Sequence, residues 1–565
     1  MTDLSLTAGA VLIARLKSLG VDYIFANSGT DFPPIIEGLA AAAVQGVPVP
    51  NALTIPHEHA AMGMAHGYYL ATGRPQAVFA HTDVGLANCA IGALNAHVEH
   101  VPVLLFSGRT PVTERGRFGS RTVPIGWGQE MRDQTALVRE ACKWDYELRF
   151  PEQAIDLPDR ALAIAASSPP GPVYVSLPRE VLCEPCPAGT LTDPPRMRAH
   201  GAAADPAAMA DLAARIAAAA HPVIFAQHGA GTDAGFDALA RIAADWGIPV
   251  CQYWANILAL PTDHPMAAPG DPGPLLARAD LVICLDTLAP WMPAAQEPLP
   301  TATVVQMGPN PLASRTPVRN FRADIAIASD TGPGIVALEA ALAAHSPAAT
   351  VADRIARLTR EHATARAAAR RAAEPDSAQG MTKAQVALAL SDALEGQGAT
   401  VLSELGVPMA PLTLTHRHAW FQEPHAGGLG WSFPAALGMQ LADPGRLVVA
   451  TMGDGGYMFA NPVACHQIAE ALGLPVLVII LNNAEWGAVR QSVLGMYPDG
   501  AAARANEMPL TGLSPSPDFC MVARASRAWA ERAATAAELA DLLPQALAHV
   551  RARKGAAVLE VVTRR

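Results

Sequence analysis

Short apolar runs alternate with helical patterns along the chain, and this alternation constrains the fold more than any other feature. The first stretch contains "PQAVFAH" (75–81), "VPVLLFSG" (101–108) and "GPVYVSLP" (171–178). Runs of this length between helices indicate strands that are covered on both faces of a parallel sheet. We therefore expect an α/β fold.

The same alternation occurs twice more. The second stretch contains "HPVIFAQHGAG" and "ADLVICLD", and the third contains "ATVLSELG", "RLVVATMGDGG" and "LPVLVIILNN". We predict three doubly wound parallel-sheet domains, at residues 1–185, 200–345 and 375–565. The Pro-rich stretch after the first is predicted to be a linker. Its Cys183 and Cys186 have no further metal ligands nearby, which disfavours a zinc site.

Composition excludes several classes of protein. Hydrophobic residues make up 51% and charged residues 16%, as in a large globular protein. Forty basic and fifty-one acidic side chains give a net charge of −11, which disfavours nucleic acid and anionic membranes as partners. The N-terminus resembles an amphipathic helix more than a signal peptide, and no apolar run is long enough to span a bilayer. With eight spread cysteines, we expect free thiols and a cytoplasmic location.

Glycines surround one carboxylate in Gly453-Asp454-Gly455-Gly456, directly after a predicted strand. Glycine amides and a following helix N-terminus can hold a diphosphate, but a carboxylate would repel it unless a cation lies between them. Asn482-Asn483 ends the next predicted strand, and loops at the carboxyl ends of neighbouring strands meet. Their oxygens suit Mg²⁺. A glycine turn is the simpler interpretation of the first motif alone, but the pair favours a metal site.

This pair of motifs resembles the diphosphate and metal motif of thiamine-diphosphate-dependent enzymes, and the resemblance extends over nearly the whole chain. It implies the domain order pyrimidine-binding, central, diphosphate-binding. It also implies that Mg²⁺ is bound by Asp454, Asn483 and the main-chain carbonyl of Glu485. The residues then expected around the diphosphate in this motif are Gly453, Gly455, Gly456 and Tyr457.

A lone acid begins the helical pattern "HEHAAMGMAHGYYLATG". Thiamine chemistry requires a carboxylate against the aminopyrimidine, and the resemblance assigns this role to Glu58. Burial suits a proton-sharing role because it disfavours the charged form of a carboxyl group. An acid that stabilises the helix N-terminus is the structural alternative. His57 and His59 are expected to pack or to form hydrogen bonds, since alternate residues on a helix point apart.

Two further residues in the first domain match the family. "HTDVGLANCAIGAL" looks particularly like benzoylformate decarboxylase, in which a histidine at this place transfers protons on the bound substrate; here it is His81. A structural histidine is the alternative, although imidazole suits proton transfer near neutral pH. "FANSGTDFPPI" resembles the family's early substrate loop, with Thr30 at the position of a substrate-contacting serine. Threonine keeps the hydroxyl group.

The third domain carries another specific match, "PHAGGLGWSFPAALG", to the stretch that bends thiamine into its V shape. The resemblance implies that Leu429 lies between the two rings and that the Gly427 carbonyl accepts from the 4′-amino group. The "SELGVPMAP" loop lacks the family's usual hydroxyl groups. The amides of Gly406 and Val407 are therefore expected to serve the diphosphate, and Pro408 and Met409 to line an apolar pocket.

The central domain departs from benzoylformate decarboxylase. Its second catalytic histidine is missing from "LDTLAPWMPAAQEPLP", where Trp291, Met292 or Gln296 lies nearby. The reacting carbon that remains after loss of CO₂ must then receive its proton from another group, or it reacts with an aldehyde or ketone instead. "QHGAG" does not follow a dinucleotide fingerprint, so flavin is not expected. Trp486, Tyr457, Phe32 and Met409 suit an apolar substrate pocket or the core equally well.

The sequence thus predicts a lyase that depends on thiamine diphosphate and Mg²⁺ and decarboxylates a 2-oxo acid, with or without carboligation to an aldehyde or ketone. The alternatives are an acetolactate-synthase-like carboligase, a nicotinamide-binding dehydrogenase built on "QHGAG", and a homologue that only binds cofactor. The resemblance also implies a homodimer or homotetramer in which Glu58 and the metal site of one active centre come from different chains.

Overall fold

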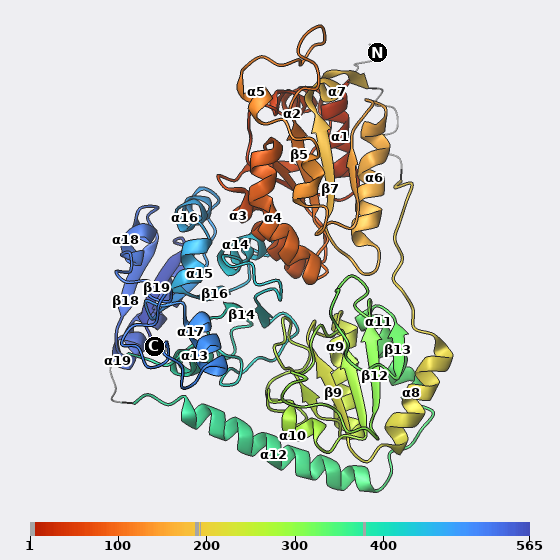
Figure 1. Ribbon diagram of the computed structural model, residues 1–565, viewed down its shortest axis with the longest axis vertical. Helices are drawn as coiled ribbons and strands as arrows, with labels where there is room; N and C mark the ends of the chain where they lie inside the picture. Colours follow the sequence, from red (N-terminus) through yellow and green to blue (C-terminus); the bar gives the residue numbers. More distant parts are fainter. Residues whose placement is uncertain (1–5, 187–190, 192–193, 377–379, 565) are drawn as a thin grey trace.

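The computed structural model describes residues 6–186, 191, 194–376 and 380–564, and it shows three α/β domains (Figure 1). The predicted fold class is confirmed, since each of three large sheets lies within one of the predicted segments. The first domain lies above the other two in Figure 1, with the central domain below it on the right and the third on the left.

The first domain contains a six-stranded parallel sheet in the order β3-β2-β4-β5-β7-β6. Its strands are β2 (Tyr23–Ala26), β3 (Asn51–Thr54), β4 (Ala77–Ala80), β5 (Leu104–Arg109), β6 (Asp145–Glu147) and β7 (Val173–Pro178). Its helices are α1 (Ala8–Ser18), α2 (Pro33–Gln45), α3 (Glu58–Thr72), α4 (Thr82–Val98), α5 (Ile125–Gly128), α6 (Gln153–Ala166) and α7 (Arg179–Cys183), with a 3-10 turn at Gln134–Leu137.

Successive residues of β4 show why its run is continuously apolar. Phe79 packs in the cluster formed with α1 and α6, whereas Val78 packs in the cluster formed with α3 and α4. Both faces of the strand are therefore buried, as expected of a parallel sheet. The predicted linker begins later than expected, because β8 (Pro185–Cys186) pairs with β1 (Leu6–Thr7) and buries Cys186 in the first domain. The described cysteines form no disulfide with one another.

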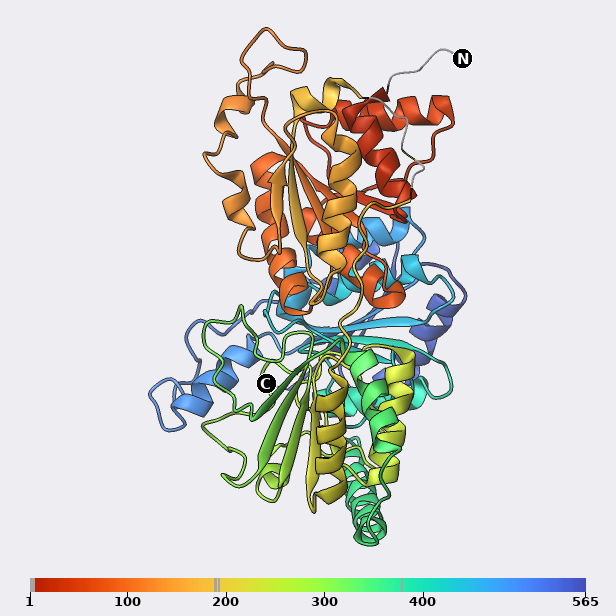
Figure 2. The same ribbon diagram turned by 90° about the vertical axis from the view of Figure 1, so that its right-hand side faces the viewer.

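The central domain contains a five-stranded parallel sheet in the order β10-β9-β11-β12-β13. Its strands are β9 (Pro222–Ala226), β10 (Val250–Cys251), β11 (Leu281–Leu285), β12 (Thr303–Gly308) and β13 (Ile325–Ala328). Its helices are α8 (Pro206–Ala218), α9 (Asp233–Trp246), α10 (Gly273–Leu276) and α11 (Thr331–Leu342). The long helix α12 (Thr350–Ala372) then runs beneath the molecule to the third domain (Figures 1 and 2).

The third domain contains a six-stranded parallel sheet in the order β15-β14-β16-β17-β19-β18. Its strands are β14 (Thr400–Glu404), β15 (Trp420–Gln422), β16 (Val448–Gly453), β17 (Leu477–Asn482), β18 (Trp529–Ala533) and β19 (Ala557–Val562). Its helices are α13 (Lys383–Ala393), α14 (Ser432–Ala442), α15 (Asp454–Phe459), α16 (Pro462–Ala471), α17 (Gly487–Met496), α18 (Phe519–Arg524) and α19 (Ala536–Arg551).

In every sheet the first strand lies between the second and the third, so that the chain reverses its direction of winding beside the first strand. The reversal occurs at β2/β4, β9/β11 and β14/β16. Ligands of open α/β sheets bind at the carboxyl ends of the strands at such points. The fold thus offers three candidate crevices. Over the described part of the chain, no helix combines the length and apolar character needed to cross a bilayer.

Helix α3 of the first domain packs directly on helix α14 of the third. A Cβ atom at Gly438 would lie 2.0 Å from the carbonyl oxygen of Met64, so the two backbones touch where only glycine fits. The apolar cluster around this crossing contains residues of both sheets. The crossing therefore fixes the start of α3 relative to the loop that precedes α14.

Candidate active site

Asp454 does not lie in an open loop, as the glycines around it suggested, but is the first residue of α15. Gly453 caps this helix in an extended conformation (φ −70°, ψ 160°). Asp454 is 2% exposed, and burial raises the pKa of its carboxyl group to about 6. Its Oδ2 atom has no hydrogen-bond partner among the described residues. A buried oxygen of this kind fits a cation ligand, which is the role predicted for it.

The next strand places Asn483 beside Asp454. Gly453 is paired with Leu481 across β16 and β17, so the residues that follow both strands leave the sheet side by side. Asn482 turns away, because its Nδ2 donates to Glu560 Oε1 at 2.8 Å. Asn483 Oδ1 accepts from the main-chain N–H of Glu485 at 3.1 Å. Asn483 rather than Asn482 therefore remains the asparagine predicted to bind the metal.

Glu485 is oriented by several contacts. Its side chain is buried, with Oε1 accepting from Thr511 Oγ1 at 2.9 Å, and its carbonyl accepts from the N–H of Gly487 at 2.8 Å. A carbonyl oxygen has a second lone pair, so it can still coordinate an ion. Asp454, Asn483 and Glu485 therefore form an oxygen set that fits Mg²⁺.

The loop after β14 does not leave the Val407 amide free to bind a diphosphate, contrary to the expectation. The Val407 amide donates to Thr451 Oγ1 at 3.2 Å and is buried, so it is not free for a diphosphate. A Cβ atom at Gly406 would lie 2.3 Å from the same hydroxyl, which holds the loop tightly on β16. Lys383, at the start of α13, donates through Nζ to the Leu405 carbonyl. The lysine brings a positive charge to a loop that lacks hydroxyl groups, and the sequence analysis missed it.

Tyr457 and Phe32 are core residues and do not form a substrate pocket. The Tyr457 side chain is fully buried, with its hydroxyl 2.6 Å from His466 Nε2, so only its main chain could contact a cofactor. Phe32 packs in the core of the first domain. Trp486 covers the start of α15, because a Cβ atom at Gly455 would lie 2.2 Å from its ring.

A buried carboxylate fixes the loop that was predicted to bend thiamine. Glu404 Oε1 accepts from the N–H of Gly430 at 2.6 Å, and Oε2 accepts from the N–H of Ser432 at 2.8 Å. Gly427 and Gly430 adopt positive φ angles of 69° and 84°, which favour glycine. Leu429, the predicted wedge, is half-buried between them. We missed the role of Glu404 because it depends on how β14 lies against this loop.

Glu58 is 4% exposed at the start of α3, as its predicted role requires. Two amides hold its carboxylate. Asn27 Nδ2 donates to Oε1 at 3.0 Å, and Asn88 Nδ2 donates to Oε2 at 2.9 Å. A Cβ atom at Gly85 would lie 2.8 Å from Oε1, so glycine makes room for the carboxylate. Neither asparagine was predicted: Asn27 directly follows β2, and Asn88 lies within α4.

The two histidines beside Glu58 form hydrogen bonds, as expected. His57 caps α3 and accepts the N–H of His59 through Nδ1, and His59 Nε2 lies 3.2 Å from the carbonyl of Gly430. Asn95 also exchanges two hydrogen bonds with Gly428, at 2.9 and 3.1 Å. One chain therefore brings the start of α3 against the glycine loop of its own third domain, whereas the resemblance implied two chains.

His81 follows β4 and forms a pair with Asp31. Its Nδ1 is hydrogen-bonded to Asp31 Oδ1, and this bond raises the pKa of His81. Its Nε2 lies 2.9 Å from Gln129 Nε2. The following residue, Thr82, has a φ of 36°, a strained conformation that accompanies functional sites. Asp31 and Gln129 were not predicted, because only the folded loops bring them to His81.

Thr30 lies beside this pair. It is exposed, its carbonyl accepts from Arg179 Nη1 at 3.1 Å, and it lines the same hollow as Asp31 and Gln129. Two of the residues named for the segment that lacks a second histidine are not suited to replace it. Trp291 is fully buried against Phe225, and Met292 is exposed.

Family models agree with this geometry domain by domain. The N-terminal, central and C-terminal domains of the thiamine pyrophosphate enzymes match residues 6–137, 209–338 and 407–561. The chain is a thiamine pyrophosphate enzyme. The family membership inferred from the two motifs is thereby confirmed.

Curated relatives of this thiamine pyrophosphate enzyme match nearly end to end. A probable 2-ketoarginine decarboxylase of Pseudomonas aeruginosa is 29% identical, covering 92% of this chain and 88% of the relative. Benzoylformate decarboxylase of the same organism is also 29% identical, covering 94% and 95%. An acetolactate synthase of Mycobacterium bovis is 27% identical, covering 96% and 86%.

Solved structures share the fold. A thiamine diphosphate-dependent 4-hydroxybenzoylformate decarboxylase of Rhodococcus jostii superposes with a TM-score of 0.78 at 22% identity and covers 99% of both chains. The benzoylformate decarboxylase of Polynucleobacter necessarius gives a TM-score of 0.77 at 20% identity, over 99% of this chain and 98% of that one. At these identities the similarity concerns the fold.

Proposed function

We propose that this enzyme uses thiamine diphosphate and Mg²⁺ to decarboxylate a 2-oxo acid. The observation that carries the proposal is the position of Glu58. Its carboxylate is held by two amides at the start of α3, and the neighbouring His59 contacts the loop that ends at Gly430. The same loop touches α15, because a Cβ atom at Gly430 would lie 2.5 Å from the carbonyl carbon of Phe459.

Each part of the site has a chemical task. Bound thiamine diphosphate would supply the electron sink that decarboxylation requires. Asp454, Asn483 and the Glu485 carbonyl would hold Mg²⁺, and Lys383 would add positive charge near the diphosphate. Glu58 would exchange a proton with the aminopyrimidine of the bound cofactor.

The His81–Asp31 pair handles protons on the substrate side. Asp31 fixes the orientation of the imidazole through Nδ1, and Nε2, which lies beside the Gln129 amide, would give or take a proton. Thr30, in the same hollow, offers a hydroxyl to a substrate carboxylate.

The test is a panel of aliphatic and aromatic 2-oxo acids, assayed for CO₂ and aldehyde with saturating thiamine diphosphate and Mg²⁺. At least one acid should be decarboxylated, and calorimetry should show that cofactor binding requires Mg²⁺. The absence of thiamine diphosphate binding, with NADH bound instead, would refute the proposal and favour a dehydrogenase. Cofactor binding without turnover of any acid would favour a non-catalytic homologue.

A second candidate, carboligation to an aldehyde or ketone, is favoured by the central domain. Trp291 is buried and Met292 is exposed, and neither of these two residues of the segment expected to deliver the second proton is suited to proton transfer. The carbonyl carbon of an aldehyde or ketone could then react in place of that proton, which is carboligation. Incubation of pyruvate with and without an added aldehyde separates the two outcomes, because a decarboxylase releases acetaldehyde and a carboligase forms acetolactate or another hydroxyketone.

The assembly proposed for this enzyme is a cytoplasmic homodimer or homotetramer. The contacts of His59 and Asn95 with the third domain lie within one chain here, and exchange of domains between two chains would preserve them. Mixing Glu58→Gln protein with Asp454→Asn protein tests this point. Recovery of activity on mixing would indicate that each active site is formed by two chains. An active monomer in gel filtration would refute such shared active sites.

A further inference from the structure

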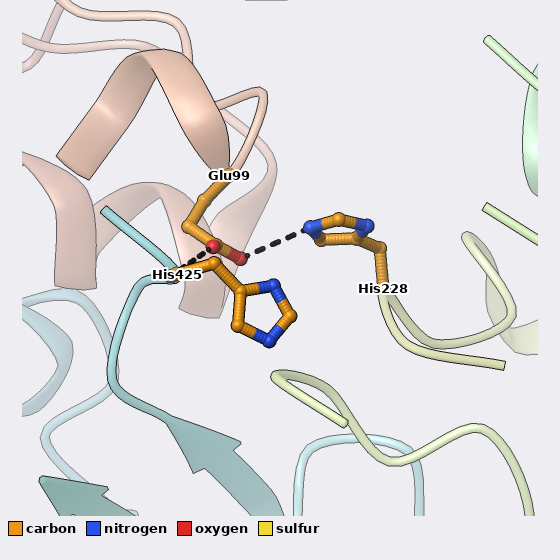
Figure 3. A group of neighbouring side chains, drawn as sticks. All are labelled: Glu99, His228 and His425. Atoms are coloured by element: carbon orange, nitrogen blue, oxygen red, sulfur yellow. Dashed lines mark hydrogen bonds and ion pairs between the residues drawn. The ribbon is translucent and has the colours of Figure 1, made fainter. Parts of the chain in front are cut away.

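Three side chains, one from each domain, meet near the start of the loop that contains Gly427 (Figure 3). Glu99 follows α4 of the first domain, His228 follows β9 of the central domain, and His425 precedes Gly427 in the third. One ligand atom from each lies within 4.8 Å of the other two. His228 Nε2 lies 3.4 Å from Glu99 Oε2, and both side chains are at most 8% exposed.

The outer nitrogen of each imidazole is bound to a backbone carbonyl. His228 Nδ1 lies 2.8 Å from the carbonyl oxygen of Asp286, and His425 Nε2 lies 3.0 Å from that of Trp254. A carbonyl oxygen can only accept, so these two nitrogens carry the hydrogens. In the neutral rings, the remaining nitrogens, His228 Nε2 and His425 Nδ1, are therefore acceptors.

These two inner nitrogens are buried and have no hydrogen-bond partner among the described residues. Figure 3 shows that both face the carboxylate of Glu99, which also only accepts. Its Oε1 already receives the main-chain N–H of His425 at 2.9 Å, but its Oε2 faces His228. With both rings neutral, three acceptor groups converge without a donor, so the site requires either a proton on His228 Nε2, which would pair with Glu99, or a cation between the three groups.

We propose that Glu99, His228 and His425 bind a divalent transition-metal ion, with Zn²⁺ the ion that best fits the ligands. Two imidazoles and one carboxylate form a common three-ligand zinc set that leaves a fourth position open. Histidines that bind metals usually donate their other N–H to a carbonyl or carboxylate, as both do here. The nitrogen ligands distinguish this site from the all-oxygen Mg²⁺ site at Asp454.

The surroundings suit a ligand site. His228 and Asp286 follow β9 and β11, the strands at which the central sheet reverses its winding, where open α/β sheets bind ligands. His228 and His425 also line a cavity of about 400 Å³ whose walls include Lys143 and Arg315. A water molecule or a small anion in this cavity could fill the fourth position.

Cobalt provides the test, because Co²⁺ replaces Zn²⁺ and is visible by absorption. Chelator-treated protein is reloaded with saturating Mg²⁺ and thiamine diphosphate and titrated with Co²⁺ alone. We expect one equivalent per chain, with the visible bands of a four- or five-coordinate nitrogen site, and displacement by Zn²⁺. His228→Gln and Glu99→Gln should each lose this equivalent, while the matched control His97→Gln, in the same cavity, should keep it.

Folded wild-type protein that takes up no Co²⁺, or variants that bind it as tightly as wild type, would overturn the proposal. The first result would mean that a proton on His228 pairs with Glu99 instead. Because either variant could unfold, X-ray absorption of the wild-type cobalt protein provides a second measurement, and a spectrum without imidazole ligands would also overturn the proposal. Neither readout depends on turnover of a 2-oxo acid.

Discussion

Gly67 of α3 lies directly against Ala435 of α14, and a Cβ atom at Gly67 would be 1.9 Å from the Ala435 carbonyl oxygen. The contact joins the first and third domains about two and a half turns along α3 from Glu58. Because the obstacle is backbone, it cannot move aside as a flexible side chain could.

Substitution of Gly67 by alanine should therefore destabilise the protein by about 1–3 kcal/mol or more through overpacking. Chemical denaturation measures the free energy of unfolding. Gly73→Ala is the control for steric crowding, because a Cβ atom at Gly73 would meet nothing within 4 Å. The φ of 68° at Gly73 adds backbone strain to this variant. A stability of Gly67→Ala equal to wild type would mean that the helices do not cross as closely as described.

Glu58→Gln should lower turnover by about 10²–10⁴-fold, because the amide cannot exchange a proton as the carboxyl group does. Thiamine diphosphate should still bind, since the metal loop is untouched. Asn88→Ala should have a smaller effect on turnover, because Asn27 continues to hold the carboxylate. Steady-state kinetics and calorimetry measure the two effects. Near-normal turnover of Glu58→Gln would remove it from the mechanism.

Asp31→Asn should change the pH dependence of stability. The hydrogen bond to Asp31 raises the folded-state pKa of His81 above its usual 6.5. The protonated ring is thereby stabilised in the folded state, so this contribution is complete below about pH 6.5 and disappears as pH rises through the raised pKa. The difference in unfolding free energy between wild type and Asp31→Asn should shrink with rising pH. An NMR titration of His81 should show a lower pKa in the variant, and an unchanged value would contradict the pairing.

Asp454→Asn should separate binding from stability. The variant should lose Mg²⁺-dependent binding of thiamine diphosphate, because a metal ligand is gone. Without cofactor, however, it should be more stable than wild type by about 1–3 kcal/mol, since a buried carboxylate oxygen without a partner is replaced by a neutral group. Calorimetric titration and denaturation of the cofactor-free proteins test both parts. A less stable variant would show that Asp454 is already satisfied in the empty site.

Lys383→Met should weaken thiamine diphosphate binding about tenfold, or about 1.4 kcal/mol. Lys383 is the cation that contacts the loop after β14, where Val407 has no free amide. Thiamine monophosphate, with less charge, should lose less affinity than the diphosphate. If both ligands lose equally, the lysine acts on the fold of the loop and not on the phosphate charge.

The parts of the site that the sequence predicted share one property. Asp454, Asn483 and His81 follow buried strands, and the carboxyl ends of parallel strands necessarily meet. The parts it missed depend on tertiary packing. Asp31 reaches His81 from another loop, and whether the Val407 amide is free depends on Thr451 in the neighbouring strand. The core position of Tyr457 could not be predicted because apolar aromatic residues suit pockets and cores alike.

The crossing of α3 and α14 has a consequence for symmetry. The first and third sheets have the same strand order, and each of these helices connects the second strand of its sheet to the third. The contacts are also reciprocal, since a glycine of each helix meets the backbone of the other. The two domains thus associate through equivalent surfaces, as the subunits of a twofold dimer do. One chain thus contains an internal pseudo-dimer, in which one half carries Glu58 and the other Asp454.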